Sequence, residues 1–523
     1  MDQKLKLQLE GGEAMALSSA QACPDNVLHE LEYPRRKREF RQELEAITDD
    51  IEALVCRLLG IRGVYIWGEP QWDSGSFNLV IPMETGPHVD TMVYLRLPFP
   101  HRTPTTASLD EKLRTEIATY LWMQENCPDV PIPTLHAFGL PDGQCYTHPD
   151  KTPFLSKLGW LFQNAIRSLL GYPARTRHVR RWRRHSLASG FLLLSRARGK
   201  SLPFRWLKRG HDETFRQNVC RGLVHARLSM NRVQFPRIAS LYLDADGCIT
   251  LSNRPLHLHM SIFEIQGVPG IPRDRTYRDI EQYFLDLLAW HDRQLLNQPN
   301  AILDQDEGRE QLAVVAGLRS IMHLYTRPHL ENNPIHLSLT DLQPSNIFVD
   351  EAGNLTTIID LEFACTLPAS MHLPPHWLTS MTLDGFAKTD SKDPEFYIQE
   401  YLRVFEEEEE KQSGQSKYAS LARDTWESGA FWFNHAVMAP NVATLLFKRR
   451  IMPQFAGNVD GPIFHQVFSH FWCKDSEEFI RMKLQSTEVY RDRLRQAFDE
   501  LSGKKLPSDA QKNGSATHDT SIN

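Results

Sequence analysis

The segment HLSLTDLQPSNIFVDEAGNLTTIIDLEFA, at residues 336–364, is the most informative part of the chain. Its apolar runs NIFVD and LTTIID flank a turn at residues 351–354, and this pattern predicts a β-hairpin. Around the hairpin lie Asp341, Asn346 and Asp360, separated by five and then fourteen residues. A carboxylate can take the proton of an attacking hydroxyl group, and amide and carboxylate oxygens are ligands that Mg²⁺ accepts. One hairpin would therefore hold a base and metal ligands together, as phosphoryl transfer requires.

The motifs in this segment resemble those of the protein-kinase-like superfamily, most closely its aminoglycoside phosphotransferase-like branch, which includes fungal members. D-L-x-P-x-N at residues 341–346 and I-D-L-E at residues 359–362 carry the resemblance, and the second motif replaces the D-F-G of protein kinases. The resemblance implies that Asp341 is the catalytic carboxylate. It also implies that Asn346 and Asp360 bind Mg²⁺ and that ATP donates the phosphoryl group.

A kinase-like site needs further parts upstream: a flexible cover for the phosphates, a cation on a strand and a carboxylate on the next helix. The loop Ser74-Gly75-Ser76 offers backbone N–H groups with little steric bulk, although such a loop is more often only a turn. Arg96 in the predicted strand VYLRLP precedes Glu116 on a predicted helix by twenty residues. We expect Arg96 and Glu116 to pair near the phosphates of ATP. By resemblance, the strand FLLLS at residues 191–195 is the hinge between two lobes.

Three positions depart from the superfamily pattern. Leu339 stands where a histidine usually precedes the catalytic aspartate, and His336 lies three residues further upstream. Arg96 replaces the usual lysine, and its planar fork would contact phosphate differently. The loop at Gly75 has one glycine where three are common. The main hypothesis is an ATP- and Mg²⁺-dependent phosphotransferase that acts on a hydroxyl group of a small molecule. The alternative is a catalytically impaired nucleotide-binding pseudokinase or scaffold of the same fold.

The predicted fold is α+β, with a small N-lobe of antiparallel sheet plus helix and a larger, mainly helical C-lobe. A chain of 523 residues exceeds what one core usually accommodates. Apolar residues from Phe40 to Leu58 recur every three or four positions and predict one helix that Gly60 ends. Ser108 and Glu111 have the spacing of a capping box, which predicts the start of a second helix that Cys127 ends.

The expected organisation has four parts. It consists of a mobile segment at 1–34, an N-lobe at 35–190 that includes an insertion at 141–190, a hinge and C-lobe at 191–502, and a disordered tail at 503–523.

The expected partners are ATP and an unidentified small-molecule acceptor; the sequence indicates no oligomeric state. With 59 Lys and Arg against 65 Asp and Glu, the chain carries a net charge of -6 and has no general attraction for nucleic acid. Six arginines and Trp182 at residues 175–184 could bind nucleic acid, but a solvated surface in an insertion is the preferred interpretation. Because no apolar run is long enough for a membrane span or signal peptide, we expect a cytoplasmic protein without a membrane partner.

Overall fold

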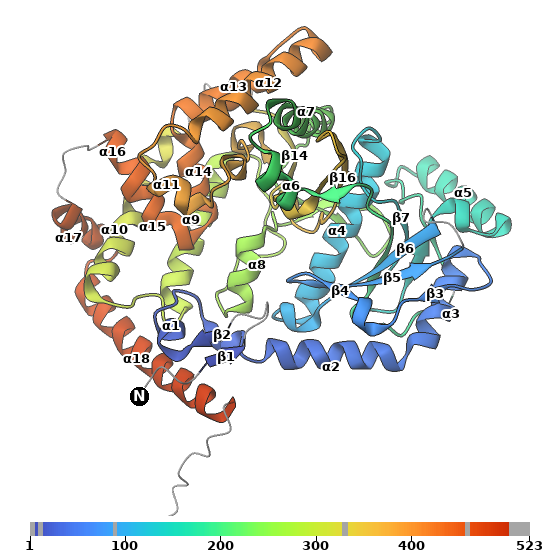
Figure 1. The fold of residues 1–523 in the computed structure, drawn as a ribbon, viewed down its shortest axis with the longest axis horizontal. Coiled ribbons are helices and arrows are strands. Elements are labelled where there is room, and N and C mark those ends of the chain that lie inside the picture. The colour runs from blue at the N-terminus through green and yellow to red at the C-terminus, as the bar shows by residue number, and fades with distance from the viewer. Residues whose placement is uncertain are drawn as a thin grey trace, which may run out of the picture.

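The computed structural model describes residues 6–8, 14–86, 91–181, 183–326, 333–455 and 461–501. The predicted tail at 503–523 and Trp182 lie outside these residues. Figure 1 shows a sheet-containing lobe, with β5, β6 and β7, beside a larger lobe of helices that includes α9, α10 and α18. The predicted α+β fold with two lobes is confirmed by this arrangement.

The N-lobe is built on one antiparallel sheet with the strand order β3-β5-β6-β10-β7-β8-β9, and β4 pairs with β5. Its strands are β3 Tyr65–Ile66, β4 Asp73–Ser74, β5 Asn78–Glu84, β6 Met92–Pro98, β7 Leu135–Gly139, β8 Cys145–Thr147, β9 Val179–Arg180 and β10 Phe191–Ser195. Alternate side chains point to opposite faces of the sheet. Leu193 therefore packs toward α3, whereas its neighbour Leu192 packs toward α4. The strand predicted as the hinge, β10, is the central strand between β6 and β7.

The helix predicted from Phe40 to Leu58 is two helices, α2 Tyr33–Ala46 and α3 Thr48–Leu59. The backbone leaves the helical region at Ile47, with φ -115° and ψ 22°. Apolar spacing alone did not reveal this break, because the spacing continues across it. Gly60 ends α3 as predicted, with a φ of 69° that glycine adopts readily.

Helix α4, Thr106–Asn126, runs between the sheet and the C-lobe (Figure 1). Its cap is Thr105, whose side chain accepts a hydrogen bond from the Ser108 N–H, so the prediction of Ser108 as the cap was wrong. Glu111 does not close a capping box, because its carboxylate forms ion pairs with Arg254 and Arg273 of the C-lobe. The predicted end at Cys127 is confirmed.

The C-lobe consists mainly of helices. They are α6 Leu202–Arg209, α7 Glu213–Met230, α8 Leu258–Ile265, α9 Ile280–Asn297, α10 Gln305–Ile321, α11 Leu383–Lys388, α12 Glu395–Ser413, α13 Lys417–Glu427, α14 Ala430–Met438, α15 Pro440–Leu446, α16 Met452–Phe455, α17 Gly461–Trp472 and α18 Ser476–Leu501. The predicted hairpin is confirmed as β15 Ile347–Val349 and β16 Leu355–Ile358, and β11 Lys200–Ser201 pairs with β15. Two further antiparallel pairs are β12 Ser240–Leu243 with β13 Ile249–Asn253, and β14 Ile335–Leu339 with β17 Ala364–Pro368.

Part of the N-terminal segment packs on the C-lobe, which differs from the expectation of a mobile end. After β1 Lys6–Gln8 and β2 Ala14–Ala16, the short helix α1 Leu17–Gln21 begins. Val27 and Leu31 are buried against Tyr490 and Leu494 of α18. This contact joins residues more than 450 positions apart, so no local pattern could have predicted it.

The segment predicted as an insertion, 141–190, contributes β8 and the edge strand β9 to the sheet. It also contains helix α5, Phe154–Leu169. Within the described ranges, we find no helix with the length and apolar character that crossing a bilayer would require.

Candidate active site

The β15–β16 hairpin brings the predicted base and metal ligands close together. The side-chain amide of Asn346 donates a hydrogen bond to the backbone carbonyl of Asp341, at 2.9 Å. The backbone N–H of Ile359 donates to the carbonyl of Asn346, also at 2.9 Å, which places Asp360 next to this point. Asp360 has a φ of 63°, a left-handed conformation that is uncommon outside glycine and is found at many functional sites.

Arg96 joins the N-lobe to this hairpin. Its Nε lies 3.2 Å from Oε1 of Glu116, as the predicted pairing requires. Its Nη2 lies 2.6 Å from Oδ1 of Asp360 in the C-lobe. Arg96 and Glu116 are buried, whereas 24% of the Asp360 side chain is exposed. One guanidinium group therefore links a strand, a helix and the proposed metal-binding loop.

Three further side chains complete the cluster and were missed in the sequence. They are Glu362, Lys112 and Asn78. Glu362 forms an ion pair with Lys112 at 2.9 Å and accepts a hydrogen bond from the side-chain amide of Asn78 at 3.0 Å. It also lies 3.3 Å from Nη2 of Arg96. Two signals could have identified these residues: Glu362 belongs to the I-D-L-E motif, and Lys112 precedes Glu116 by one helical turn, so both face the same side of α4.

Burial and mutual charge control the protonation of this cluster. Burial raises the pKa of Glu116. The positive charge of Arg96 lowers this pKa, but the negative charges of Glu362 and Asp360 offset part of that lowering. Burial likewise raises the pKa of Asp360. Burial also acts on Glu362, but the charges of Lys112 and Arg96 overcome it and hold its pKa below the usual value. Glu362 is therefore the firmly ionised member of the cluster.

Glu362→Gln should lower the free energy of unfolding by about 3 kcal/mol, because it removes the charge that compensates two buried cations. Urea denaturation measured by circular dichroism would show this as a lower midpoint. Glu351→Gln is the matched control, since Glu351 is 81% exposed and pairs with Arg205 at the surface. We expect the control to change stability far less than Glu362→Gln, because exposed ion pairs contribute little. Equal effects of the two variants would contradict the proposed importance of Glu362.

Asp341 faces a second environment beside the hairpin. Burial raises its pKa to about 7, and the negative charge of Asp360 adds to this effect. The Gln343 amide donates to Oδ1 of Asp341 at 2.9 Å. The loop is also held by Trp377, whose indole N–H donates to the carbonyl of Leu342 at 2.9 Å. These contacts organise the loop without a histidine at position 339.

His336 does not replace the histidine that is missing at position 339. Its Nδ1 lies 2.8 Å from the backbone carbonyl of Val233, so this ring nitrogen is already engaged. His336 is also fully buried.

The Ser74-Gly75-Ser76 loop is less well suited to phosphate than predicted. The N–H of Ser74 bonds to the Asp73 carboxylate at 2.8 Å, and the N–H of Gly75 bonds to the carbonyl of Asn78 at 3.0 Å. Two of the three amide groups are thus already engaged. The contact with the hairpin region comes from the next residue, Phe77, whose ring lies 5.6 Å from that of Phe363.

A cavity of about 330 Å³ opens beside Asp341 on the C-lobe side. Its lining includes the loop that carries Asp341, apolar residues from α14 and α15, four histidines and one arginine: Ser338, Thr340, Asp341, Gln343, Trp377, Met438, Val442, His257, His259, His376, His435 and Arg227. Burial lowers the pKa of all four histidines, to about 3 for His257 and about 4 for His259. The imidazoles are therefore neutral near pH 7. A small molecule in this cavity could present a hydroxyl group to Asp341.

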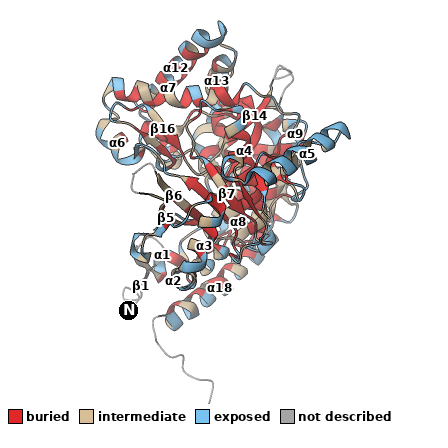
Figure 2. Cartoon of the chain, turned by 90° about the vertical axis from the view of Figure 1, so that its right-hand side faces the viewer, coloured by how far each residue is buried: buried red, intermediate tan, exposed pale blue. Residues whose placement is uncertain are grey.

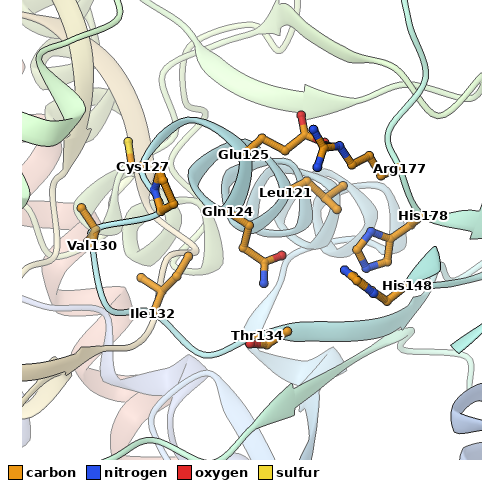
Figure 3. Close-up of a pocket in the computed structure, with 11 residues that line it drawn as sticks. Leu121, Gln124, Glu125, Cys127, Val130, Ile132, Thr134, His148, Arg177 and His178 are labelled. Atoms are coloured by element: carbon orange, nitrogen blue, oxygen red, sulfur yellow. The ribbon is translucent and has the colours of Figure 1, made fainter. Parts of the chain in front are cut away.

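A second cavity, of about 320 Å³, lies between the end of α4 and strands β7 to β9 (Figure 3). Figure 3 shows His148 and His178 side by side, with Arg177 reaching toward Glu125. The ring centroids of the two histidines are 5.3 Å apart, and Arg177 pairs with Glu125 at 3.2 Å. None of the predicted site residues lines this cavity, so we do not assign it to the active site.

The side chains of Asn346 and Asp360, predicted as Mg²⁺ ligands, fit that ion by their chemistry. Asp360 offers a carboxylate and Asn346 an amide oxygen, and Mg²⁺ usually completes its shell with phosphate oxygens and water. Among the residues that the structure describes, no group of three or more His, Cys, Asp or Glu side chains could hold a metal without such help. Asn346 and Asp360 would therefore hold Mg²⁺ together with a nucleotide.

No protein-family model matches the chain, and no curated protein matches it. Among solved structures, the chain is similar to the GDP and kanamycin complex of APH(2")-IIia, at 12% identity and a TM-score of 0.35, over 84% of this chain and 98% of that chain. It is similar to the GDP complex of wild-type aminoglycoside 2'-phosphotransferase-IIIa, at 12% identity and a TM-score of 0.33, over 83% and 93%. It is also similar to a Plasmodium vivax ethanolamine kinase, at 12% identity and a TM-score of 0.34, over 78% and 82%. At this identity the likeness concerns the fold alone.

Proposed function

We propose that this protein is a phosphotransferase that moves the γ-phosphoryl group of ATP to a hydroxyl group of a small molecule. The observation that carries the proposal is the meeting of Asp341, Asn346 and Asp360 at one hairpin, tied to the N-lobe by Arg96. Structural roles alone would not require a base, two oxygen ligands and a strand-borne cation at one place. The likeness to solved small-molecule kinases accords with the proposal but does not carry it.

Each residue has a distinct task in the proposed reaction. Asp341 accepts the proton of the acceptor hydroxyl, whose oxygen forms a bond to the γ-phosphorus as the bond to the β-phosphate bridging oxygen breaks and ADP leaves. Mg²⁺, when bound, neutralises charge on the phosphate oxygens. Asn346 and Asp360 would hold this ion, and Arg96 positions Asp360. The cavity beside Asp341 would hold the acceptor.

The proposal is tested with purified protein, ATP and a panel of small alcohols. ATP with Mg²⁺ should raise the melting temperature, whereas ATP with EDTA should raise it less. ADP release should then depend on one class of acceptor. A protein that shows no thermal shift with any nucleotide would contradict both the main hypothesis and the pseudokinase alternative.

A pseudokinase of the same fold remains the second candidate, because two observations favour it. Arg96 directly contacts the carboxylate that should bind Mg²⁺, at 2.6 Å, and position 339 is leucine. Nucleotide binding without ADP release on any acceptor would support this candidate over an active enzyme.

The rate of transfer should rise with pH through about 7. Only the ionised form of Asp341 can take a proton, and its pKa is raised to about 7, so the base is largely protonated below that pH. A plot of log kcat/KM against pH should therefore rise with a slope near one below pH 7 and level off above it. A profile that is flat from pH 5 to pH 9 would exclude Asp341 as the base.

A further inference from the structure

Helix α5 exposes its apolar face to solvent and turns its polar face toward the protein, which is the opposite of an ordinary surface helix. The residues on its protein side are only partly covered and mainly polar: Ser156, Lys157, Trp160, Asn164 and Arg167. Its solvent side carries large apolar side chains with high exposed fractions: Phe154 72%, Leu155 81%, Leu158 45%, Leu161 49%, Phe162 68%, Ile166 41% and Leu169 86%. No residue of α5 is buried, and Figure 2 shows the helix at the edge of the molecule, largely in the colour of exposed residues. An ordinary helix buries such a stripe in the core.

The exposed stripe continues past the end of the helix. Leu170 is 67% exposed and Tyr172 is 58% exposed. Isolated exposed apolar residues are common, but a contiguous exposed stripe of this kind usually marks a contact with another surface.

The charge around α5 identifies that surface. Residues 151–190 contain nine Lys or Arg and no Asp or Glu, on a chain whose net charge is -6. Among the residues that the structure describes, the ion pairs of this segment are Arg177 with Glu125, Arg167 with Asp246 at 3.7 Å and Lys157 with Asp150 at 4.0 Å, so six of the nine cations form no ion pair there. Arg180, Arg183 and Arg184 are exposed and lie just after the helix.

We propose that α5 and the following arginines dock this protein on an anionic membrane surface. An exposed apolar helix face flanked by basic residues can insert among acyl chains while the cations contact lipid phosphates and carboxylates. Nucleic acid would use the arginines but not the apolar stripe, and a protein partner would not need an acid-free stretch of this length. The expectation of no membrane partner rested on the absence of a spanning segment and on the net charge of -6, whereas docking in the interface requires only a local apolar and basic surface.

The test is vesicle co-sedimentation of the full-length protein. Vesicles of phosphatidylcholine with 30% phosphatidylserine should bind the protein, and vesicles of phosphatidylcholine alone should bind it at least tenfold more weakly. Binding should also weaken between 50 mM and 500 mM NaCl, because salt screens the arginines. Equal binding to both vesicle types, or no binding to either, would overturn the proposal.

Variants separate the apolar and basic contributions. Phe162→Ser with Leu169→Ser should lower the affinity for the anionic vesicles at least tenfold, as should Arg180→Gln with Arg183→Gln and Arg184→Gln. Leu207→Ser is the matched control, because Leu207 is 79% exposed but lies on α6, away from the apolar stripe of α5. This control variant should bind the anionic vesicles as the wild type does. The melting temperature should be the same for all variants.

Two other occupants of the stripe have different signatures. A concentration-dependent dimer that Phe162→Ser abolishes would show that a second copy covers α5. Submicromolar RNA binding at physiological salt, lost in the arginine variant and retained in the serine variant, would show a nucleic-acid site. Either result, in the absence of vesicle binding, would overturn membrane docking.

Arg227 gives a second, independent inference about the cavity beside Asp341. Within the described residues, buried arginines have carboxylate partners; Arg96, Arg216 and Arg254 are examples. Arg227 is half-buried and lines the cavity, and its guanidinium group has no ion pair or hydrogen bond in the part of the chain that the structure describes. His257, on the same cavity, is 1% exposed, and both of its ring nitrogens lack a hydrogen-bond partner. The cavity thus holds an uncompensated cation and unsatisfied imidazoles.

We infer that the acceptor carries an acidic group as well as its hydroxyl group, and this inference rests on the proposed function. Asp341 is the only carboxylate among the cavity-lining residues that the structure describes, and it makes no ion pair with Arg227. An acidic group held by Arg227 would leave the hydroxyl group for Asp341. A polycation or a quaternary amine would be repelled by the positive charge of Arg227, and the cavity lining offers no carboxylate other than Asp341 to pair with it.

The probes are sodium acetate and sodium chloride at equal ionic strength. Acetate should raise the melting temperature of the wild type more than chloride, and Arg227→Met should abolish that difference, whereas Arg227→Lys should retain part of it. In turnover assays, glycerate should exceed glycerol and ethanolamine at least tenfold as the acceptor. An acetate effect that persists in Arg227→Met, or preference for ethanolamine, would overturn the inference. The thermal shift with ATP and Mg²⁺ reports separately on the proposed function and should be unchanged in Arg227→Met.

Discussion

Asp360→Asn is expected to remove the Mg²⁺-dependent part of the thermal shift with ATP and to lower turnover roughly 1000-fold. Asparagine is the suitable replacement, because it tolerates the φ of 63° at this position and keeps the shape of the side chain while losing the charge. The loss of one carboxylate ligand would weaken the hold on Mg²⁺ and leave Arg96 to face the phosphates alone. The measurement compares melting temperatures with ATP in the presence of Mg²⁺ and of EDTA.

The control for this variant is Asp384→Asn. Asp384 is 46% exposed and pairs with Lys388 on the surface of α11, so its replacement should leave both readouts unchanged. A Mg²⁺-dependent shift of normal size in Asp360→Asn would remove Asp360 from the proposed metal site.

Asp341→Asn should retain nucleotide binding and lose transfer, with kcat lowered by about 1000-fold. The amide keeps the hydrogen bond from Gln343 within reach but cannot accept the proton of the acceptor. The remaining activity should also lose its dependence on pH near 7, since the group that titrates there is gone. Thermal shift with ATP and Mg²⁺ and initial rates from pH 5 to pH 9 provide the measurements.

A different result would separate a base from a structural residue. If Asp341→Asn lowers the melting temperature and nucleotide binding together, the side chain supports the loop. If the variant keeps wild-type activity, Asp341 is not the base.

Local sequence patterns predicted correctly those elements whose structure depends on residues close together in the chain. The turn at residues 351–354 and its flanking apolar runs predicted the β15–β16 hairpin, because a short hairpin is determined by its own residues. The pairing of Arg96 with Glu116 was expected from the resemblance to kinase-like sites, in which a cation on a strand pairs with a carboxylate on the next helix. The contact between Arg96 and Asp360 joins residues 264 positions apart, and only the closed arrangement of the two lobes brings them together.

One prediction that differs from the structure failed because distant side chains compete with local ones for the same hydrogen-bonding and charged groups. Ser108 and Glu111 have the spacing of a capping box, but Arg254 and Arg273 bind Glu111 and Thr105 supplies the cap. No local rule reveals that two distant arginines compete for one carboxylate. The exposure of the apolar stripe of α5 was not predicted either, because a sequence pattern does not indicate which face of a helix meets the protein.

Helix α4 makes the two lobes one cooperative unit. Its residues from Glu111 to Met123 are all buried, on one side against β7 and β10 of the sheet and on the other against β12 and β17 of the C-lobe. Neither lobe could unfold alone without exposing half of this helix to water. The chain should consequently lose its sheet and its hairpin in the same transition, and a smaller side chain at Leu113 or Ile117 would weaken both lobes together. Because Glu116 belongs to the same helix, the ion pairs of the proposed site cannot outlast the core that the lobes share.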